Sequence, residues 1–457
     1  MPKLIMKYQL NWNSLLSAKR LGSASLVPKN MARSQFQRDY DRIIFSSPFR
    51  RLQNKTQVFP LPGSVFVHNR LTHSLEVASV GRSLGNMLAI ELEKRPELSG
   101  NDFFSVFGPI VSAACLAHDM GNPPFGHSGE KAISRYFLEG NGKSIQGMVD
   151  EVQWNDLTHF EGNANAFRVL THQFNGRRNG GFALTYATLA SLVKYPYGSE
   201  AMPEKKNKYG FFSSEKDTFE DIAREQGIIQ ISDAPVRYCR HPLVYLVEAA
   251  DDITYQIMDV EDAHKLKILS TSETRDVLMA FWDPASEDGK SFISNSKHVF
   301  STVTDPNEQI SYLRALLINK LVSECVAVFM SHYSGIMNGV YHQSLIDSLE
   351  GISAEGMKHC RKLSVERIYN HSSVIEVELA GYRILGALMD EFVDAVLHPQ
   401  SHYARKLLAL LPGQFRSTPD ASAYTRIQSV LDFISGMTDL YALELYRTIH
   451  GIQISYQ

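Results

Sequence analysis

Apolar residues recur at helical spacing along most of the chain. In residues 73–94 they fall near one stripe of a 3.6-residue helix, at Leu75, Val77, Val80, Leu84, Met87 and Leu88. Residues 107–120 are almost all apolar or small, which predicts a buried helix. The same pattern predicts helices over residues 241–266, 305–333, 373–397 and 424–449. We therefore expect an all-α fold, with one large helical domain and a C-terminal helical extension.

Three stretches depart from the helical pattern. Residues 195–227 are rich in Gly, Pro, Ser and Lys, which predicts an exposed loop before helix resumes. Residues 140–163 are predicted to form a second loop that links two helical parts. A short β-hairpin is predicted over residues 56–68, because Leu61-Pro62-Gly63 is a turn signal between two β-branched runs.

Composition and charge narrow the classes of protein. The 457 residues carry a net charge of -3. This overall charge gives no support for a protein whose whole surface binds nucleic acid or membranes. The 4 cysteines are far apart and form no CxxC pair, which excludes a zinc ribbon and disfavours a disulfide framework. The N-terminus lacks the features of a signal peptide, and no stretch approaches the roughly 18 apolar residues of a membrane span. We expect a soluble cytoplasmic protein.

The main chemical signal is the pair His118-Asp119, at the end of the apolar helix predicted over residues 107–120. Burying an adjacent imidazole and carboxylate is costly unless the carboxylate meets a charge or a metal, so the pair suggests a compensating cation. Two prolines and two glycines then predict a stiff turn before His127. Glu130 follows on the same face of the next helix, where a carboxylate can orient the imidazole and fix its tautomer.

A second group of acidic residues lies on the helix predicted over residues 241–266. Asp251, Tyr255 and Asp259 are four residues apart, so they share one stripe of that helix. A stripe of this composition is unusual on a core-facing surface unless it faces a polar cavity.

Four residues are candidate metal ligands: His73, His118, Asp119 and Asp251. By itself His73 is most simply interpreted as a hydrogen-bonded, half-buried side chain. With the other three it completes a set of two imidazoles and two carboxylates, which suits a divalent cation with open positions for water. We expect Mn²⁺ or Mg²⁺, with Fe²⁺, Co²⁺ or Ni²⁺ as alternatives.

The order of these residues resembles the HD phosphohydrolase superfamily, and their flanks resemble one branch of it, the deoxyguanosinetriphosphate triphosphohydrolases (dGTPases) and related dNTP triphosphohydrolases. The resemblance runs from about Asn11 to about Gly451. It is carried by the stretches SPFRRLQNKTQVFPL, NRLTHSLEV, LAHDMGNPPFGHSGE, HFEGNANAFR, KYGFFSSEKDTF, YLVEAADDITYQIMDVEDA and ISGMTDLYALELY.

The resemblance implies an activity and a set of site residues. The activity is metal-dependent cleavage of dGTP, or of dNTPs, to deoxynucleoside and tripolyphosphate by attack at the α-phosphorus. The four candidate ligands would bind the metal. The catalytic residues beside the α-phosphate would be His127, Glu130 and His159. The phosphates would be bound by Arg70, Lys194, Lys208 and Tyr255. The sugar would be bound by Gln57, Val58 and Asp259.

The resemblance also implies an organisation and partners. Residues 1–270 would form the HD catalytic core with an N-terminal arm, and residues 271–457 a C-terminal helical region that completes the site and makes subunit contacts. A homo-oligomer is expected, and single-stranded DNA is a further candidate partner. Some relatives have a lysine directly after the distal metal aspartate, whereas this chain has Asp252. Because a carboxylate facing a triphosphate would repel it, we expect Asp252 to point away from the site.

Several alternatives stay open. Within the same class, the chain could be a broad dNTP triphosphohydrolase that needs a nucleotide activator. In other classes, it could be an HD nucleotide phosphodiesterase or 5′-nucleotidase, or a degenerate HD protein that senses nucleotides or holds single-stranded DNA. The long matching flanks and the complete set of candidate ligands argue against these other classes. His127 could act as base, acid or nucleophile, and the base preference is open.

Overall fold

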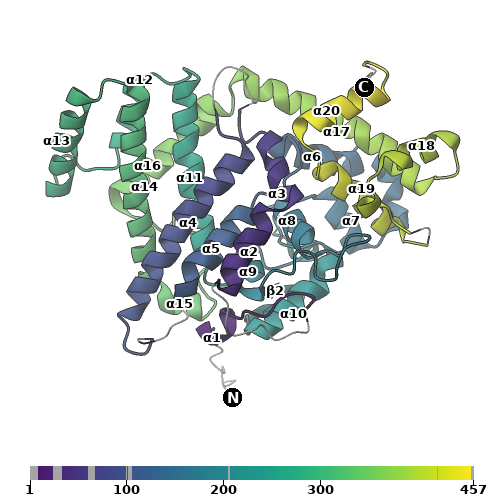
Figure 1. Cartoon of the computed structure of the whole chain (residues 1–457), viewed down its shortest axis with the longest axis horizontal. Helices are drawn as coiled ribbons and strands as arrows, with labels where there is room; N and C mark the ends of the chain where they lie inside the picture. Colours follow the sequence, from purple (N-terminus) through teal and green to yellow (C-terminus); the bar gives the residue numbers. More distant parts are fainter. Residues whose placement is uncertain are drawn as a thin grey trace.

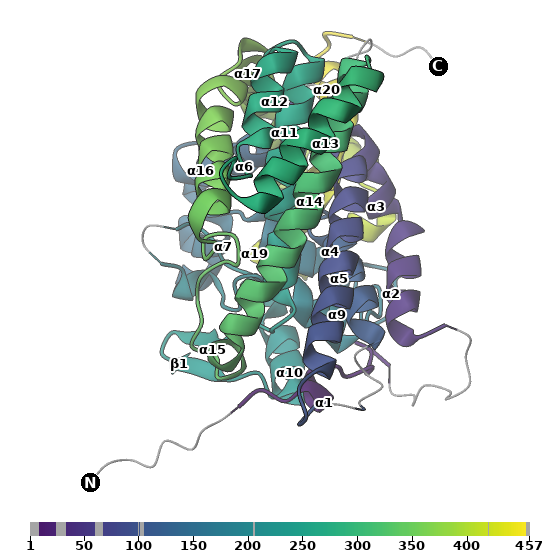
Figure 2. The ribbon, with the colours of Figure 1, turned by 90° about the vertical axis from the view of Figure 1, so that its left-hand side faces the viewer.

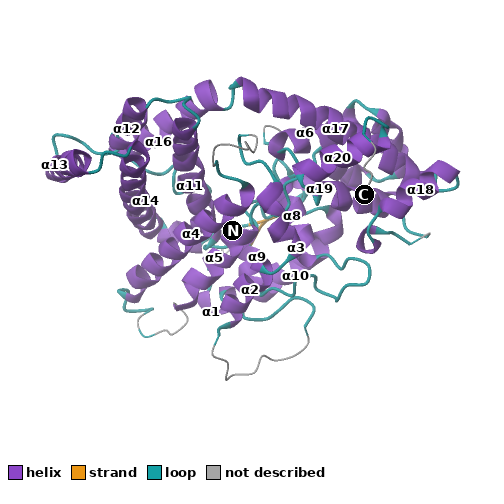
Figure 3. Ribbon diagram, turned by 45° about the horizontal axis from the view of Figure 1, so that its top comes forward, coloured by secondary structure: helices purple, strands orange, loops and turns teal. Residues whose placement is uncertain are grey.

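Helices make up nearly all of the regular structure, as predicted (Figure 3). The computed structural model of the chain describes residues 9–23, 33–59, 67–98, 100, 105–203, 206–418 and 420–453. Among these residues the strands β1 (Gln230–Asp233) and β2 (Val236–Tyr238) pair antiparallel and form a small two-stranded sheet. No described helix is long and apolar enough to cross a membrane.

A layer of long helices forms the centre of the molecule (Figures 1 and 2). Helix α4 (Arg70–Glu93) packs against α5 (Phe107–Ala117), α11 (Val244–Lys265) and α14 (Pro306–Ser331). Helix α5 also packs against α2 (Gln35–Ile44) and α9 (Tyr186–Leu192). Every residue of α5 is buried except Pro109, as its apolar composition predicted. These helices share the first of two hydrophobic cores, which also includes α12 (Thr271–Met279) and α16 (Gly351–Leu363).

A second hydrophobic core lies beside the first, on the right of Figure 1. Here α17 (Ser372–Leu397) packs against α6 (Gly126–Leu138), α18 (His402–Leu410) and α19 (Ala423–Ser435). Helix α20 (Asp439–Ile449) also packs against α17. Residues far apart in the sequence therefore share this core, and the division of the chain at residue 270 stays a prediction.

Most of the remaining described elements are short. They are α1 (Trp12–Leu15), α3 (Ser47–Arg51), η1 (Leu52–Asn54), η3 (Asn141–Met148), α7 (Glu151–Thr158), α8 (Gly162–Thr171), η4 (Ser199–Ala201), η5 (Ser213–Glu215), α10 (Lys216–Gln226), α13 (Glu287–Thr302), α15 (Tyr333–Met337), the π-helical turn η6 (Ser364–Ile368) and η7 (Gly413–Phe415). The four cysteines are all free and buried.

The structure corrects the predicted loops. Residues 140–163 are largely helical, because they form η3 and α7. Asp150 stabilises the start of α7 through a capping box. In residues 195–227, helix α10 begins at Lys216, and the side chains of Tyr209 and Phe212 are fully buried, so this segment is not an exposed loop. Aromatic residues within a Gly- and Lys-rich stretch were the overlooked signal.

The predicted hairpin over residues 56–68 and the predicted helix over residues 424–449 have different outcomes. The turn of the predicted hairpin, Leu61-Pro62-Gly63, lies outside the described residues, although Thr56 and Asn69 on its flanks form an isolated antiparallel bridge. The run predicted as one helix over residues 424–449 is two helices, α19 and α20, because the chain turns at residues 436–438.

Candidate active site

His73, His118 and Asp119 lie together where the central helices meet. One ligand atom of each lies within 4.8 Å of the others. His73 is on α4, and His118 and Asp119 directly follow α5. Asp251 of α11 places its Oδ1 3.1 Å from Nε2 of His73 and 3.5 Å from Nε2 of His118. The structure therefore brings all four predicted ligands together.

The surroundings of His118 fit a bound cation. Its Nδ1 donates a 2.6 Å hydrogen bond to the carbonyl of Cys115, so Nε2 is the nitrogen that faces the other ligands. This Nε2 is buried without a hydrogen-bond partner in the described part of the chain. Burial disfavours the imidazolium, yet Asp119 and Asp251 raise the pKa of His118 to about 9. The carboxylates of Asp119 and Asp251 thus favour a positive charge beside Nε2 of His118. A divalent cation would supply that charge and could bind both the imidazoles and the carboxylates.

Asp119 is fixed by two neighbours. Its Oδ2 accepts a 2.8 Å hydrogen bond from Arg70, and its Oδ1 accepts one from the side-chain amide of Asn122. Burial opposes ionisation, but Arg70 and His118 hold the pKa of Asp119 below its ordinary value. Gly126 makes room for Arg70, because a Cβ at this position would lie 2.7 Å from Nη2 of the guanidinium. Arg70 therefore orients a predicted metal ligand.

His127 and Glu130 form the hydrogen-bonded pair that their spacing predicted. Nδ1 of His127 donates to Oε2 of Glu130 at 2.9 Å, and Oε1 accepts from the backbone amide of Gly162, also at 2.9 Å. A Cβ at Gly162 would lie 2.5 Å from that carboxylate oxygen, so the close approach requires glycine. Burial opposes ionisation, but the bond from His127 lowers the pKa of Glu130. With Nδ1 engaged, Nε2 of His127 is the atom that can exchange a proton with a bound molecule.

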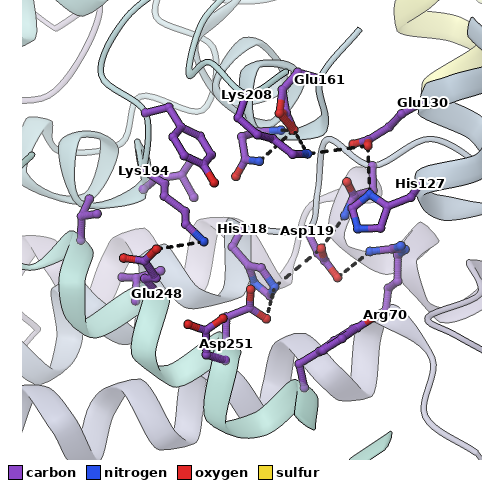
Figure 4. A pocket seen from close by; sticks show the side chains of 18 of the residues that line it. Arg70, His118, Asp119, His127, Glu130, Glu161, Lys194, Lys208, Glu248 and Asp251 are labelled. Atoms are coloured by element: carbon purple, nitrogen blue, oxygen red, sulfur yellow. Dashed lines mark hydrogen bonds and ion pairs between the residues drawn. The ribbon is translucent and has the colours of Figure 1, made fainter. Parts of the chain in front are cut away.

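A cavity of about 320 Å³ joins the metal ligands to this pair (Figure 4). Its lining is rich in charge. The acidic side chains among the described lining residues are Asp119, Glu130, Glu161, Glu248, Asp251 and Asp252, and the basic ones are Arg70, Lys194 and Lys208. His73 is only 2% exposed and is not among the lining residues.

Both predicted lysines reach the cavity, and each is paired with a carboxylate. Lys194 lies 3.1 Å from Glu248, and Lys208 lies 2.9 Å from Glu161 and 3.9 Å from Glu130. Burial disfavours each ammonium, but these carboxylates raise the pKa of both lysines above the ordinary value. A bound phosphate would have to compete with these ion pairs for the lysines.

The residues predicted to hold the sugar lie at different depths. Gln57 lines the cavity, and its Oε1 is buried without a partner in the described structure. Val58 is not among the lining residues and packs against the first hydrophobic core. Asp259 is 5% exposed, and its Oδ2 accepts a 2.8 Å hydrogen bond from the hydroxyl of Tyr369. Burial raises the pKa of Asp259 to about 8. The ring of Tyr369 lies 6.2 Å from that of Tyr255, which lines the cavity.

Two expectations from the sequence do not match the cavity. His159 is not among its lining residues, and Nδ1 of His159 lies 3.2 Å from the carbonyl of Asn155 and 3.0 Å from the hydroxyl of Thr158. Asp252 does line the cavity, so the prediction that it points away is wrong. Burial raises the pKa of Asp252 to about 7, which reduces its negative charge at neutral pH and so its repulsion of a phosphate.

Known proteins match the chain over nearly its whole length. The model of the HD domain matches residues 70–178, and that of the phosphohydrolase-associated domain matches residues 351–448. A deoxyguanosinetriphosphate triphosphohydrolase-like protein of Synechocystis sp. is 40% identical over 457 residues, covering 97% of this chain and 100% of that protein. A protein of the same name from Pseudomonas aeruginosa is 38% identical, covering 97% of this chain and 99% of that protein. The deoxyguanosinetriphosphate triphosphohydrolase of Yersinia enterocolitica is 30% identical, covering 91% of this chain and 93% of that protein.

The chain belongs to the deoxyguanosinetriphosphate triphosphohydrolase family. The resemblance noted in the sequence is thereby confirmed, and this member of the family is a metal-dependent phosphohydrolase. The cavity lies within and beside the matched HD domain.

The cavity is also lined by residues that were not predicted from the sequence. Asn122 and Glu161 both line the cavity, where they bond to Asp119 and Lys208 respectively. Both stand inside motifs already singled out, LAHDMGNPPFGHSGE and HFEGNANAFR. The available signal was a polar side chain within a mostly apolar or glycine-rich stretch. Expected homo-oligomerisation and single-stranded DNA binding stay predictions.

Proposed function

We propose that the chain hydrolyses dGTP, or dNTPs more broadly, to a deoxynucleoside and tripolyphosphate by attack at the α-phosphorus. One observation carries the proposal: three of the candidate metal ligands, the His127–Glu130 pair and three basic side chains line one cavity, and the fourth candidate ligand, His73, lies directly behind them against Asp251. The names of the relatives, as deoxyguanosinetriphosphate triphosphohydrolases or proteins like them, support dGTP as the preferred substrate.

The metal site would hold the reacting phosphate. A divalent cation bound by His73, His118, Asp119 and Asp251 would polarise a phosphate oxygen and lower the pKa of water. Arg70 lies at 2.8 Å from Asp119 and lines the cavity, so it would orient both this ligand and a phosphate oxygen. Lys194, Lys208 and Tyr255 would contact the remaining phosphates.

His127 would move a proton at the α-phosphate. Its Nδ1–H is held by Glu130 at 2.9 Å, which fixes the tautomer and leaves Nε2 to exchange a proton with water or with the 5′ oxygen. Glu130 stays ionised because of this hydrogen bond, and so it stabilises the imidazolium that forms after proton uptake. His159 makes its hydrogen bonds within its own helix turn, so we assign it no proton transfer.

Three groups would recognise the sugar. The unpartnered Oε1 of Gln57 would accept a hydrogen bond from the 3′-hydroxyl. Asp259 and Tyr369 lie behind Tyr255, joined by a 2.8 Å hydrogen bond, and would set the depth of the sugar position. An enclosed position of this kind rejects a 2′-hydroxyl by crowding and by leaving it without a partner.

The proposal is tested by product analysis. Purified protein is incubated with Mn²⁺ or Mg²⁺ and each dNTP, alone and in pairs, and products are separated by ion-exchange chromatography. Tripolyphosphate with deoxyguanosine from dGTP alone is the expected result. In ¹⁸O-labelled water the label should enter tripolyphosphate and not the nucleoside, because attack at phosphorus breaks the P–O bond. Release of pyrophosphate or single phosphate, or label in the nucleoside, would contradict the proposal.

A second candidate is a broad dNTP triphosphohydrolase that requires a nucleotide activator. A separate cavity of about 720 Å³ favours it. Its described lining combines arginines with aromatic side chains, among them Arg42, Arg51, Arg177, Arg178, Phe45, Phe174, Phe182 and Phe415. Guanidinium groups bind phosphates and aromatic rings stack on bases, so the lining suits a nucleotide. Tripolyphosphate formed only from mixtures of dNTPs, and lost in Arg51→Ala, would support this candidate over the first.

A further inference from the structure

The corner between α19 and α20 binds two segments of the active site through one carboxylate. Oδ2 of Asp439 accepts a 2.8 Å hydrogen bond from the backbone amide of Thr56, and Oδ1 accepts a 3.0 Å bond from that of Phe125. Thr56 precedes Gln57, and Phe125 lies two residues before His127. One side chain therefore joins the proposed sugar-binding segment to the proposed catalytic turn.

A second tie runs through the same corner. The side chain of Lys55 is 2% exposed, and its Nζ donates to the carbonyl of Asn122 at 2.6 Å and to that of Ser435 at 2.7 Å. Asn122 in turn donates to the metal ligand Asp119. The corner thus holds the backbone on both sides of the turn formed by residues 122–126.

The conformation of this turn requires outside support. Phe125 has φ 61° and ψ 19°, in the left-handed region that a residue with a large side chain rarely adopts. Such a conformation persists only where the surroundings over-determine it. Helix α17 supplies the other support, because Gly381 lies against Phe125: a Cβ there would come within 2.8 Å of the Cβ of Phe125. Gly381 and Asp439 both lie in the matched phosphohydrolase-associated domain.

Asp439 is not explained as a helix cap. The N-cap of α20 is Thr438, whose hydroxyl accepts a 3.2 Å hydrogen bond from the amide of Tyr441. The two bonds of Asp439 run instead to segments 314 and 383 residues away in the sequence.

We propose that Asp439 is a positioning residue, which sets the distance between Gln57 and His127 without touching the substrate. The phosphohydrolase-associated domain then contributes to catalysis by holding the left-handed turn in place from two sides, through Asp439 and through Gly381. The roles given to Gln57 and His127 rest on the proposed function.

The first test compares Asp439→Asn with Thr438→Ala. Asparagine has one carbonyl oxygen, so one of the two backbone amides loses its acceptor, whereas Thr438→Ala weakens α20 and leaves Asp439 intact. We expect kcat of Asp439→Asn to fall about 10- to 100-fold at a temperature where it is fully folded, since displacements near 1 Å can cost about that much. Mn²⁺ affinity should be unchanged. Equal kcat values for the two variants would overturn the proposal.

The second test reaches the turn from the other side. Gly381→Ala should push Phe125 and lower kcat, whereas Gly386→Ala is the matched control on the same helix, because a Cβ at Gly386 meets nothing within 4 Å. Wild-type kcat in Gly381→Ala would show that the packing against Phe125 does not position His127.

A third test needs no turnover, so it separates this proposal from the proposed function. Deuterium uptake of backbone amides is measured by mass spectrometry in the metal-loaded protein. In Asp439→Asn, uptake should rise in at least one of the two peptides that cover residues 52–59 and 122–130, because one backbone amide loses its acceptor. In Thr438→Ala, it should rise only in α20. If Asp439→Asn leaves both peptides as protected as in the wild type, Asp439 does not hold them, whatever the substrate proves to be.

Discussion

A methyl group added at Gly126 tests how closely Arg70 must be held. Gly126 has φ +58°, and a Cβ there would lie 2.7 Å from Nη2 of Arg70. Alanine in this conformation costs about 1 kcal/mol of stability. The guanidinium must also recede by about 0.7 Å to restore an ordinary contact near 3.4 Å, which is inexpensive for the end of a flexible side chain. That shift strains the 2.8 Å bond that Nη1 of the same guanidinium donates to Asp119, and it moves a group that lines the cavity.

We therefore expect a small loss of stability with a large loss of activity. kcat/KM should fall about 10- to 100-fold, in line with the cost of displacing a positioned group by about 1 Å. Gly227→Ala is the matched control: it also has a positive φ, +65°, at the end of α10, and a Cβ there meets nothing within 4 Å. Urea unfolding should give similar losses for both variants, with kcat/KM unchanged in Gly227→Ala. Full activity in Gly126→Ala would refute the reasoning.

Three further predictions follow from the site and its surroundings. His73→Ala should remove bound metal, as measured by mass spectrometry of the metal content, and lower turnover by at least about 10³-fold with the fold retained; retained turnover would reject His73 as a ligand. Glu130→Gln should lower kcat by about 10²-fold with little change in KM, because the neutral amide no longer stabilises the imidazolium of His127; an unchanged kcat would reject the pair. His68→Gln tests pH dependence: burial opposes the imidazolium, but Asp262 and Glu76 outweigh it and raise the pKa of His68 from 6.5 to about 9. The folded pKa lies above the unfolded one, so this stabilisation, at most about 3 kcal/mol, is complete below pH 6.5 and is lost as pH rises through about 9. In urea unfolding, the difference in the free energy of unfolding between wild type and His68→Gln should shrink as pH rises from 6.5 through about 9. A difference that does not change with pH would reject the raised pKa of His68.

The long helices, and the grouping of the four candidate metal ligands, could be predicted because both signals are local and strong. Helix α5 is predicted by an unbroken apolar run, and the cost of burying His118-Asp119 at its end points to a cation without any knowledge of the fold. The hydrogen bond between His127 and Glu130 could be predicted for the same reason. The two residues are three positions apart on one helix, and this spacing places their side chains next to each other.

The features that were missed depend on contacts between distant segments. Asp439 looks like an ordinary acidic residue in the first turn of a helix, and its bonds to Thr56 and Phe125 are set only by the packing of α20. Burial of Tyr209 and Phe212 depends on the second hydrophobic core, whose members come from distant parts of the sequence, from Ala132 to Leu445. The prediction that Asp252 points away from the site was wrong because desolvation, which depends on the fold, raises its pKa to about 7 and so weakens its repulsion of a phosphate.

The excess of acidic side chains in the cavity predicts that binding of a nucleotide depends on divalent metal ions. Its described lining carries six acidic side chains against one arginine and two lysines. The acidic groups stay in excess even with His118 protonated and Asp252 partly neutral, so without metal ions we expect the cavity to repel a triphosphate. The two lysines do not reverse this, because Glu248 and Glu161 already hold them at 3.1 and 2.9 Å. Divalent cations would weaken this repulsion. One, held by the four candidate ligands, would offset the charge of Asp119 and Asp251, and another, bound to the phosphates, would reduce their repulsion by the remaining carboxylates. We therefore expect nucleotide affinity to rise steeply with divalent cation concentration even in His127→Ala, which should lose turnover if His127 has the proposed role. If the proposed function holds, we expect the acidic lining to make the cavity prefer a nucleotide loaded with a divalent metal ion, which a purely basic site would not do.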